Sequence, residues 1–292
     1  MKIAGFTFIR NAVINDYSVK EAILSILPIC DEFVVAVGDS EDETRKLIES
    51  IDSPKIKIID TVWDMSLRAG GQIFALETDK AFNAISKDVD WAFYIQGDEC
   101  VHEKYLPIIK EEMQQNLNNQ AVEGLLFKYL HFYGSYDFFG QSRRWYRREI
   151  RVVKRKLNVK SYRDAQGFRI DDKKINVKLI DAYIYHYGWV RPPKGATNKN
   201  VNLNSFYHDD DWMEKNIDKE EEFDYGNADN LIKFDGTHPE VCQDRIKKMN
   251  WHFSFDISLS NKNIGLRRQF LAWIENLTGY RPFEYKNYRK IN

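Results

Sequence analysis

The chain has 292 residues, 43% of them hydrophobic and 30% charged, so it can bury the core of one large domain or two modest ones. Its net charge of −1 excludes a strong general attraction to nucleic acid or to an anionic membrane. The three cysteines, Cys30, Cys100 and Cys242, have the spacing of neither a zinc site nor a disulfide framework, which favours a reducing compartment. No apolar run is long enough for a signal peptide or a transmembrane helix, so we expect a cytoplasmic protein.

Predicted strands and helices alternate through the first third of the chain. Short apolar runs predict strands over residues 3–9, 33–37, 56–60 and 91–95. Apolar residues at helical spacing predict helices over residues 18–28, 40–51 and 71–86. The first two helices begin with the spacing of a capping box, Ser18 with Glu21 and Ser40 with Glu43.

This alternation predicts a parallel sheet with helices on both faces, in which ligands bind beyond the carboxyl ends of the strands. Asp39 follows the second predicted strand and Asp98 the fourth, so we expect both carboxyl groups at the same edge of the sheet. The fourth strand ends in two adjacent acids, Asp98 and Glu99. Such an ending indicates either a solvated strand end or a site for a metal ion and a phosphate.

The rhythm changes after residue 120. Residues 121–132, 149–155 and 179–190 are predicted strands without a strong helix between them, which favours antiparallel additions to the sheet. From about Pro192 the chain becomes polar and is predicted to form loops. Two helices are expected further on, over residues 238–250 and 265–277.

Four short motifs follow one another along the chain: Arg10-Asn11-Ala12, "VGDSEDET" from residue 37, "QGDE" from residue 96 and "HYGW" from residue 186. Their order resembles that of a GT-A glycosyltransferase of the family-2 type. The resemblance implies an α/β fold for residues 1–190, with a Rossmann-like mixed sheet and helices on both faces. Residues 191–292 are then expected to form a mainly helical extension that packs on this domain.

The resemblance also implies a divalent cation, Mn²⁺ or Mg²⁺, at the end of the fourth strand. Gln96-Gly97-Asp98 occupies the place of the family's DXD motif, and Asp98 is the implied metal ligand. Gln96 departs from the pattern: its amide can contact a ribose but brings no charge to the metal. His186 is the implied second ligand, although a lone histidine in an aromatic strand is as well explained by a place in the core.

Further site residues follow from the same resemblance. Asp39 is expected to contact the nucleobase, although helix capping explains it equally well, and Thr7 and Arg10 are expected beside the same nucleotide. Arg68 and Gln72 lie where the family often contacts the donor.

A catalytic base is also implied, since an inverting enzyme needs one carboxylate to take the proton of the acceptor hydroxyl. Asp164, in a polar turn, fits this role by position, although an ordinary turn explains it equally well. Glu149 and Asp181 fit it less well, because each lies in or beside a predicted strand.

Residues 141–163 contain ten Lys or Arg residues and one acid, Glu149. This stretch is a solvated face, a site for a diphosphate or an anionic acceptor, or a nucleic-acid surface.

The predicted function is transfer of a sugar from a nucleotide-diphosphate sugar, with a UDP-sugar favoured, to a saccharide or lipid-linked acceptor. The expected stereochemical course is inversion. The implied setting is cell-surface polysaccharide or lipopolysaccharide synthesis, with peripheral contact at the inner face of the membrane left open and no nucleic acid expected. Two alternatives remain: a metal-dependent nucleotidyltransferase, and a non-catalytic relative that binds a polyanion.

Overall fold

The computed structural model describes residues 1–67, 69–217, 222–228, 230–256 and 266–291. Its helices are α1 (Val19–Ile26), α2 (Thr44–Glu49), α3 (Gln72–Asn83), α4 (Leu106–Gln115), α5 (Pro193–Ser205), α6 (Asp210–Asn216), α7 (Gln243–Lys247) and α8 (Leu266–Thr278). Its strands are β1 (Ile3–Ile9), β2 (Glu32–Gly38), β3 (Ile56–Thr61), β4 (Trp91–Tyr94), β5 (Glu99–Val101), β6 (Gly124–Tyr133), β7 (Phe138–Gly140), β8 (Arg148–Lys154), β9 (Val159–Ser161), β10 (Phe168–Ile170), β11 (Lys173–Lys174), β12 (Asn176–Trp189), β13 (Leu231–Lys233) and β14 (Arg289–Ile291).

One large mixed sheet organises the molecule. Its main path runs β13-β7-β6-β8-β4-β1-β2-β3; β12 joins this path through β6, and β5 and β14 each pair with β12. Strands β3, β2, β1 and β4 are parallel neighbours, as predicted. A small second sheet holds β11, β10 and β9. The order and direction of these strands therefore confirm the predicted α/β fold with a Rossmann-like mixed sheet.

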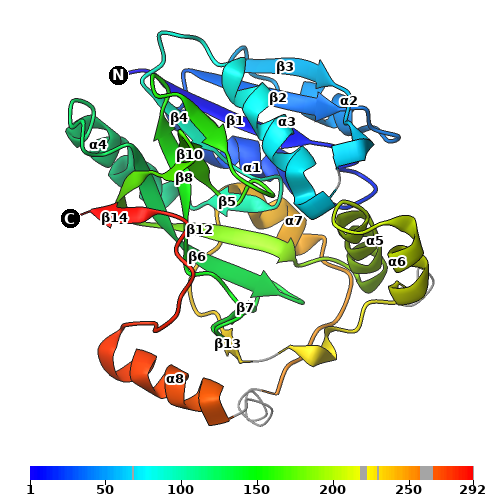
Figure 1. Ribbon diagram of the computed structural model, residues 1–292. Helices are drawn as coiled ribbons and strands as arrows, with labels where there is room; N and C mark the ends of the chain where they lie inside the picture. The colour runs from blue at the N-terminus through cyan, green and yellow to red at the C-terminus, as the bar shows by residue number, and fades with distance from the viewer. Residues whose placement is uncertain (68, 218–221, 229, 257–265, 292) are drawn as a thin grey trace.

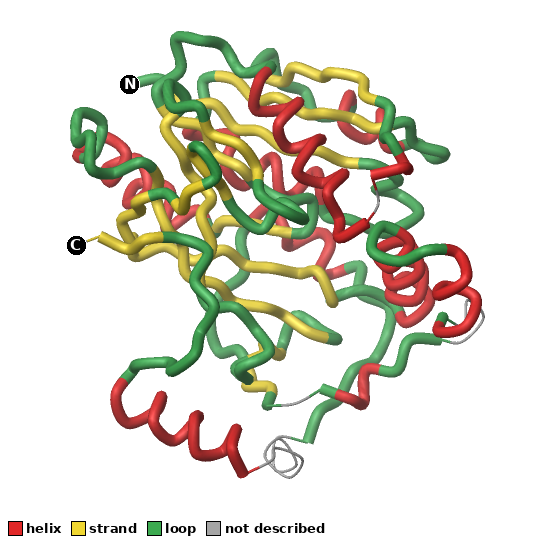
Figure 2. The backbone as a smooth tube through the Cα atoms, viewed as in Figure 1, coloured by secondary structure: helices red, strands yellow, loops and turns green. Residues whose placement is uncertain are grey.

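The sheet has apolar layers on both faces, and alternate residues of β1 supply both of them. Ile3 and Ile9 belong to the cluster that includes residues of α1, α2 and α4, whereas Ala4 and Phe6 belong to the cluster that includes residues of α3. Figure 1 shows α3 in front of β1 to β3 and α1 behind them. Figure 2 shows the strands as a continuous layer, with α8 set apart from it.

The two predicted capping boxes are wrong. Neither Ser18 nor Glu43, the residues at the helix starts, makes a side-chain cap hydrogen bond. The Ser18 hydroxyl instead lies 3.4 Å from the carbonyl oxygen of Gly97, and Ser40 accepts a hydrogen bond from the Asn11 backbone. These serines therefore hold loops at the carboxyl edge of the sheet, a role that local spacing does not reveal.

Two predictions for the second half also need correction. The late strands are not all antiparallel additions: β8 pairs antiparallel with β4 and β6, but β12 runs parallel to β6. The polar stretch after Pro192 is not only loop, because α5 and α6 lie within it. Within the extension, β13 and β14 pair with strands of the main sheet, so the extension contributes to the sheet as well as helices.

No helix of the described residues is both long enough and apolar enough to cross a membrane. All three cysteines are buried free thiols.

Candidate active site

A cavity of about 710 Å³ opens beside the carboxyl ends of β1 and β4. Arg10, Gln96, Gly97 and Asp98 line it from these strand ends, as the parallel sheet predicted. Asp164 and His186 line it as well, although they lie far away in the sequence. Six of the predicted site residues therefore meet at one cavity.

Basic side chains dominate the charge of this cavity. Its charged lining residues are Arg10, Arg143, Arg144, Arg147, Arg148, Arg151, Lys199 and Arg281 on the basic side, and Asp98, Glu149, Asp164 and Glu284 on the acidic side. Clefts lined by an excess of one sign attract ligands of the other sign. The cavity is therefore suited to an anionic ligand.

Asp98 is paired with a lysine that the sequence did not point to. The Lys199 ammonium, on α5, donates to Asp98 Oδ2 over 2.8 Å and to the carbonyl oxygen of Gly188 over 2.7 Å. Burial alone would raise the pKa of Asp98, but the Lys199 ammonium outweighs it and holds that pKa below its usual range. Asp98 therefore stays ionised at the end of β4.

A chain of hydrogen bonds fixes the state of His186. His131 Nε2 lies 2.7 Å from the Tyr146 carbonyl oxygen, which can only accept, so this nitrogen carries the proton. Burial lowers the pKa of His131 to about 3 and that of His186 to about 4, so both rings are neutral. His131 Nδ1 must then accept from His186 Nδ1, 3.1 Å away. The other nitrogen of His186, Nε2, keeps a free lone pair.

That lone pair lies beside the carboxylate of Asp98. His186 Nε2 is 3.7 Å from Asp98 Oδ2, and the two side chains are 13% and 12% exposed. A neutral imidazole held by its second nitrogen, next to an ionised carboxylate, fits a divalent cation. No group of three His, Cys, Asp or Glu side chains that could hold a metal is found in the described part of the chain. Substrate oxygens and water would therefore supply the other ligands.

Gly188 allows these groups to approach one another. A Cβ atom at this position would lie 2.7 Å from His186 Nε2 and 3.0 Å from Asp98 Oδ2. The Tyr187 backbone N–H also donates to the Asp98 carbonyl oxygen over 2.8 Å. Strand β12 thus holds the end of β4 by its backbone, and glycine is required where the two come closest.

Glu99 does not face the cavity as a second acid. Its carboxylate accepts two hydrogen bonds from Arg151, of 2.8 and 2.7 Å, and one of 2.7 Å from the Tyr129 hydroxyl. The Glu99 and Arg151 side chains are 0% and 1% exposed. This ion pair fastens β5 to β8 beneath the site.

Asp164 lies at the cavity wall within reach of two polar partners. Its Oδ2 accepts from the Tyr207 hydroxyl over 2.8 Å, and its Oδ1 accepts from Gln166 Nε2 over 2.7 Å. A Cβ atom at Gly71, which has a φ of 70°, would lie 2.8 Å from Asp164 Cβ. The loop before α3 therefore packs against this carboxylate.

Glu149, which was expected to fit the role of base less well than Asp164, lies in β8 and also lines the cavity. It is 8% exposed, and its Oε2 atom has no hydrogen-bond partner among the described residues. Burial raises the pKa of Glu149 to about 8, although Arg151 opposes the shift. This carboxyl group is therefore largely protonated at neutral pH.

Three other predicted residues are not part of the cavity lining, and a fourth lies outside the residues that the structure describes. Thr7 is 1% exposed and is not part of the cavity lining, whereas its neighbours Phe8 and Ile9 are. Gln72 is exposed at the start of α3 and is not part of the lining either. Asp39 is not part of the lining, but its Oδ1 lies 3.4 Å from Nε of Arg10, which is. Arg68 lies outside the described residues.

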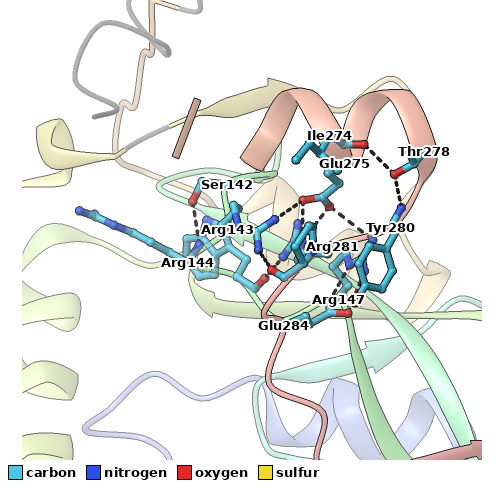
Figure 3. A network of polar contacts seen from close by, with 12 residues as sticks. Ser142, Arg143, Arg144, Arg147, Ile274, Glu275, Thr278, Tyr280, Arg281 and Glu284 are labelled. Atoms are coloured by element: carbon cyan, nitrogen blue, oxygen red, sulfur yellow. Dashed lines mark hydrogen bonds and ion pairs between the residues drawn. The ribbon is translucent and has the colours of Figure 1, made fainter. Parts of the chain in front are cut away.

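The basic stretch 141–163 is bound in part by the C-terminal segment. Arg147 donates to both oxygens of Glu284, each over 2.8 Å, and Arg143 lies 3.0 Å from Glu275. Arg281 also binds Glu275, at 2.7 Å. Figure 3 shows these side chains gathered where α8 and the following segment meet the stretch. Arg143 and Arg147, two of the ten cations of the stretch, are therefore already paired with carboxylates of the C-terminal segment.

Lys199 was missed because its surroundings in the sequence are rich in asparagine, which has low helix propensity. The signal that was available is Pro193, a favoured first residue of a helix, followed by Ala196 and Lys199 at helical spacing.

No protein-family model matches the chain, and a search of curated proteins finds no match. Among solved structures the fold is similar to that of S. aureus TarS (1–349) in complex with UDP, with 15% identity and a TM-score of 0.40 over 95% of this chain and 79% of that one. A second TarS (1–349) structure matches with 11% identity and a TM-score of 0.38, over 70% of this chain and 65% of that one.

Glucosyl-3-phosphoglycerate synthase from Mycobacterium tuberculosis, in complex with Mn²⁺, UDP and phosphoglyceric acid, matches with 17% identity and a TM-score of 0.29. The match covers 45% of this chain and 43% of that one. The chain thus spans less than two thirds of the length of the second TarS structure and of the synthase. These are similarities of fold alone.

Proposed function

We propose that the protein is a glycosyltransferase that moves a sugar from a nucleotide-diphosphate sugar to an acceptor hydroxyl with inversion. The observation that carries this proposal is the convergence of Arg10, Gln96, Asp98, Asp164 and His186 on one cavity. These residues come from four separate parts of the chain. The excess of basic side chains around them suits a donor that carries a diphosphate.

The cavity provides a group for each part of the reaction. Asp164 takes the proton of the acceptor hydroxyl while the oxygen forms its bond to the anomeric carbon. The bond from that carbon to the diphosphate breaks, and its electron pair leaves with the diphosphate. Tyr207 and Gln166 hold Asp164 in position. Glu149 does not serve as the base, because it already carries a proton at neutral pH.

Asp98 and His186 would hold the divalent cation, Mn²⁺ or Mg²⁺, whose charge neutralises the departing diphosphate. Their spacing and the free lone pair of His186 Nε2 support this assignment. Gln96 and Arg10 contact the nucleoside, and Asp39 acts at this end through its ion pair with Arg10.

The donor is a UDP-sugar and the acceptor is a saccharide or a lipid-linked saccharide of cell-surface polysaccharide or lipopolysaccharide synthesis. We place the enzyme in the cytoplasm, in contact with the inner face of the membrane. Exposed apolar side chains on α8 support this contact: Phe270, Trp273 and Leu277 are 59%, 59% and 70% exposed.

The test is a screen of nucleotide sugars for release of nucleoside diphosphate, with and without an acceptor saccharide. The expected result is slow, donor-specific hydrolysis that Asp98→Asn removes. Turnover of nucleoside triphosphates, with no nucleotide sugar bound or hydrolysed, would instead identify a nucleotidyltransferase.

A further inference from the structure

We propose that the Lys199 ammonium is a fixed cation that binds the donor diphosphate directly and independently of any divalent ion. The inference rests on the proposed function, since it assigns a group to the diphosphate of the same donor.

The position of Lys199 is the first support. Its Nζ atom lies 2.8 Å from Asp98 Oδ2, so it sits at the end of β4 where the diphosphate is expected, and its side chain lines the cavity. It reaches this place from α5, 101 residues further along the chain.

The second support is that the ammonium group is held rigidly. The Lys199 side chain is 7% exposed, and its Nζ lies 5.5 Å from the ring centroids of both Tyr17 and Trp189. Aromatic faces stabilise a cation at this distance. A lysine on a solvated surface would be free to adopt many rotamers, whereas this one is already ordered before the ligand binds.

The third support is its remaining hydrogen-bonding capacity. An ammonium has three N–H donors. Asp98 and the Gly188 carbonyl are its two acceptors among the residues that the structure describes. One donor therefore remains for an oxygen of the diphosphate.

The local charge also favours an anion. Asp98 balances one positive charge, but a second cation lies nearby. Arg191 is 1% exposed, and its Cζ atom lies 5.3 Å from the centroid of the Tyr17 ring, which Lys199 also contacts. The two cations leave the surroundings of Asp98 net positive, although Arg191 itself is not part of the cavity lining. A ligand with a diphosphate compensates that excess.

The experiment measures binding of uridine diphosphate by calorimetry in EDTA and in Mn²⁺, for the wild type, Lys199→Gln and His186→Ala. Wild type is expected to bind in EDTA. Lys199→Gln should raise the Kd at least tenfold under both conditions, and His186→Ala should raise it only when Mn²⁺ is present. Lys194→Gln, an exposed position on the same helix, is the matched control and should bind as wild type.

Two further variants separate binding from folding. Lys199→Arg keeps the charge and should retain part of the binding in EDTA. Lys199→Gln combined with Asp98→Asn leaves no unpaired buried charge, and it should remain folded in a thermal melt while binding stays lost in EDTA.

The inference is overturned if wild type binds uridine diphosphate only with Mn²⁺, or if Lys199→Gln weakens binding only in Mn²⁺. In both cases the proposed function survives, because the nucleotide still binds. If wild type binds no uridine diphosphate under either condition, both the inference and the proposed UDP-sugar donor fall.

Discussion

Glu99 and Arg151 form a bidentate ion pair that is almost completely withdrawn from water, 52 residues apart in the sequence. Glu99 is the residue after Asp98, yet its carboxylate does not line the cavity. The function of the pair is to fix the strand that follows the site.

Arg151→Met is expected to leave the Glu99 carboxylate buried without its partner. Removing one member of a buried pair costs about 3–5 kcal/mol. Urea unfolding followed by circular dichroism should show this loss, and Glu99→Gln in the same chain should recover part of it. A decrease in the free energy of unfolding of less than about 1 kcal/mol would contradict the assignment of a structural ion pair buried away from water.

Asp164→Asn is expected to lower kcat by about 10²- to 10⁴-fold, the range that a general base contributes. The KM for the donor should change little, because the amide keeps the size of the side chain. Asp181→Asn is the matched control, since this carboxylate is exposed and paired with Lys128. Full transfer activity in Asp164→Asn would place the base elsewhere.

Gly188→Ala is expected to weaken the binding of both Mn²⁺ and uridine diphosphate. The new methyl group would lie 2.7 Å from His186 Nε2 and 3.0 Å from Asp98 Oδ2. Both side chains must therefore move away from the methyl group. Titration with Mn²⁺ followed by electron paramagnetic resonance measures the effect. Gly195→Ala should bind as wild type, because its nearest neighbour would be 3.6 Å away.

Glu149→Gln is expected to change how stability depends on pH. The folded-state pKa of Glu149 is raised to about 8 from 4.5, so the folded chain binds the proton more tightly than the unfolded chain. The contribution of this group to the free energy of unfolding is fully present below pH 4.5 and is lost as the pH rises through about 8. Between about pH 5 and pH 9, the melting temperature of the wild type should therefore fall relative to that of the variant.

The size of that effect follows from the shift, at about 1.4 kcal/mol for each pKa unit. A thermal melt series for both proteins measures it. Parallel pH curves for the wild type and Glu149→Gln would show that Glu149 is ionised in the folded chain.

Glu284→Gln is expected to loosen the C-terminal wall of the cavity. Arg147 donates two hydrogen bonds of 2.8 Å to the Glu284 carboxylate, and this interaction stabilises the segment by about 1–2 kcal/mol. The substitution removes the negative charge on which the interaction depends. Hydrogen exchange should increase in residues 281–288 and remain unchanged in β1 and β2. Unchanged exchange in that segment would show that its packing does not depend on the ion pair.

The sequence determined the parallel half of the sheet and the edge at which the site lies. Apolar runs are local, so β1 to β4 could be predicted within a residue or two at most boundaries, together with the place of Asp98 at a strand end. The same runs placed Arg10 and Gln96 beside it. The family resemblance implied that His186 and Asp164 belong to the same site, and the structure brings both to the cavity.

Only the tertiary structure decided what surrounds Asp98. Lys199 lies in a polar, asparagine-rich stretch that was predicted as loop, and it meets Asp98 across 101 residues of sequence. The proton positions of His131 and His186 depend on the Tyr146 carbonyl, and the approach of β12 depends on Gly188. Contacts between segments far apart in the chain leave no periodicity in the sequence, because they arise only when packing brings those segments together.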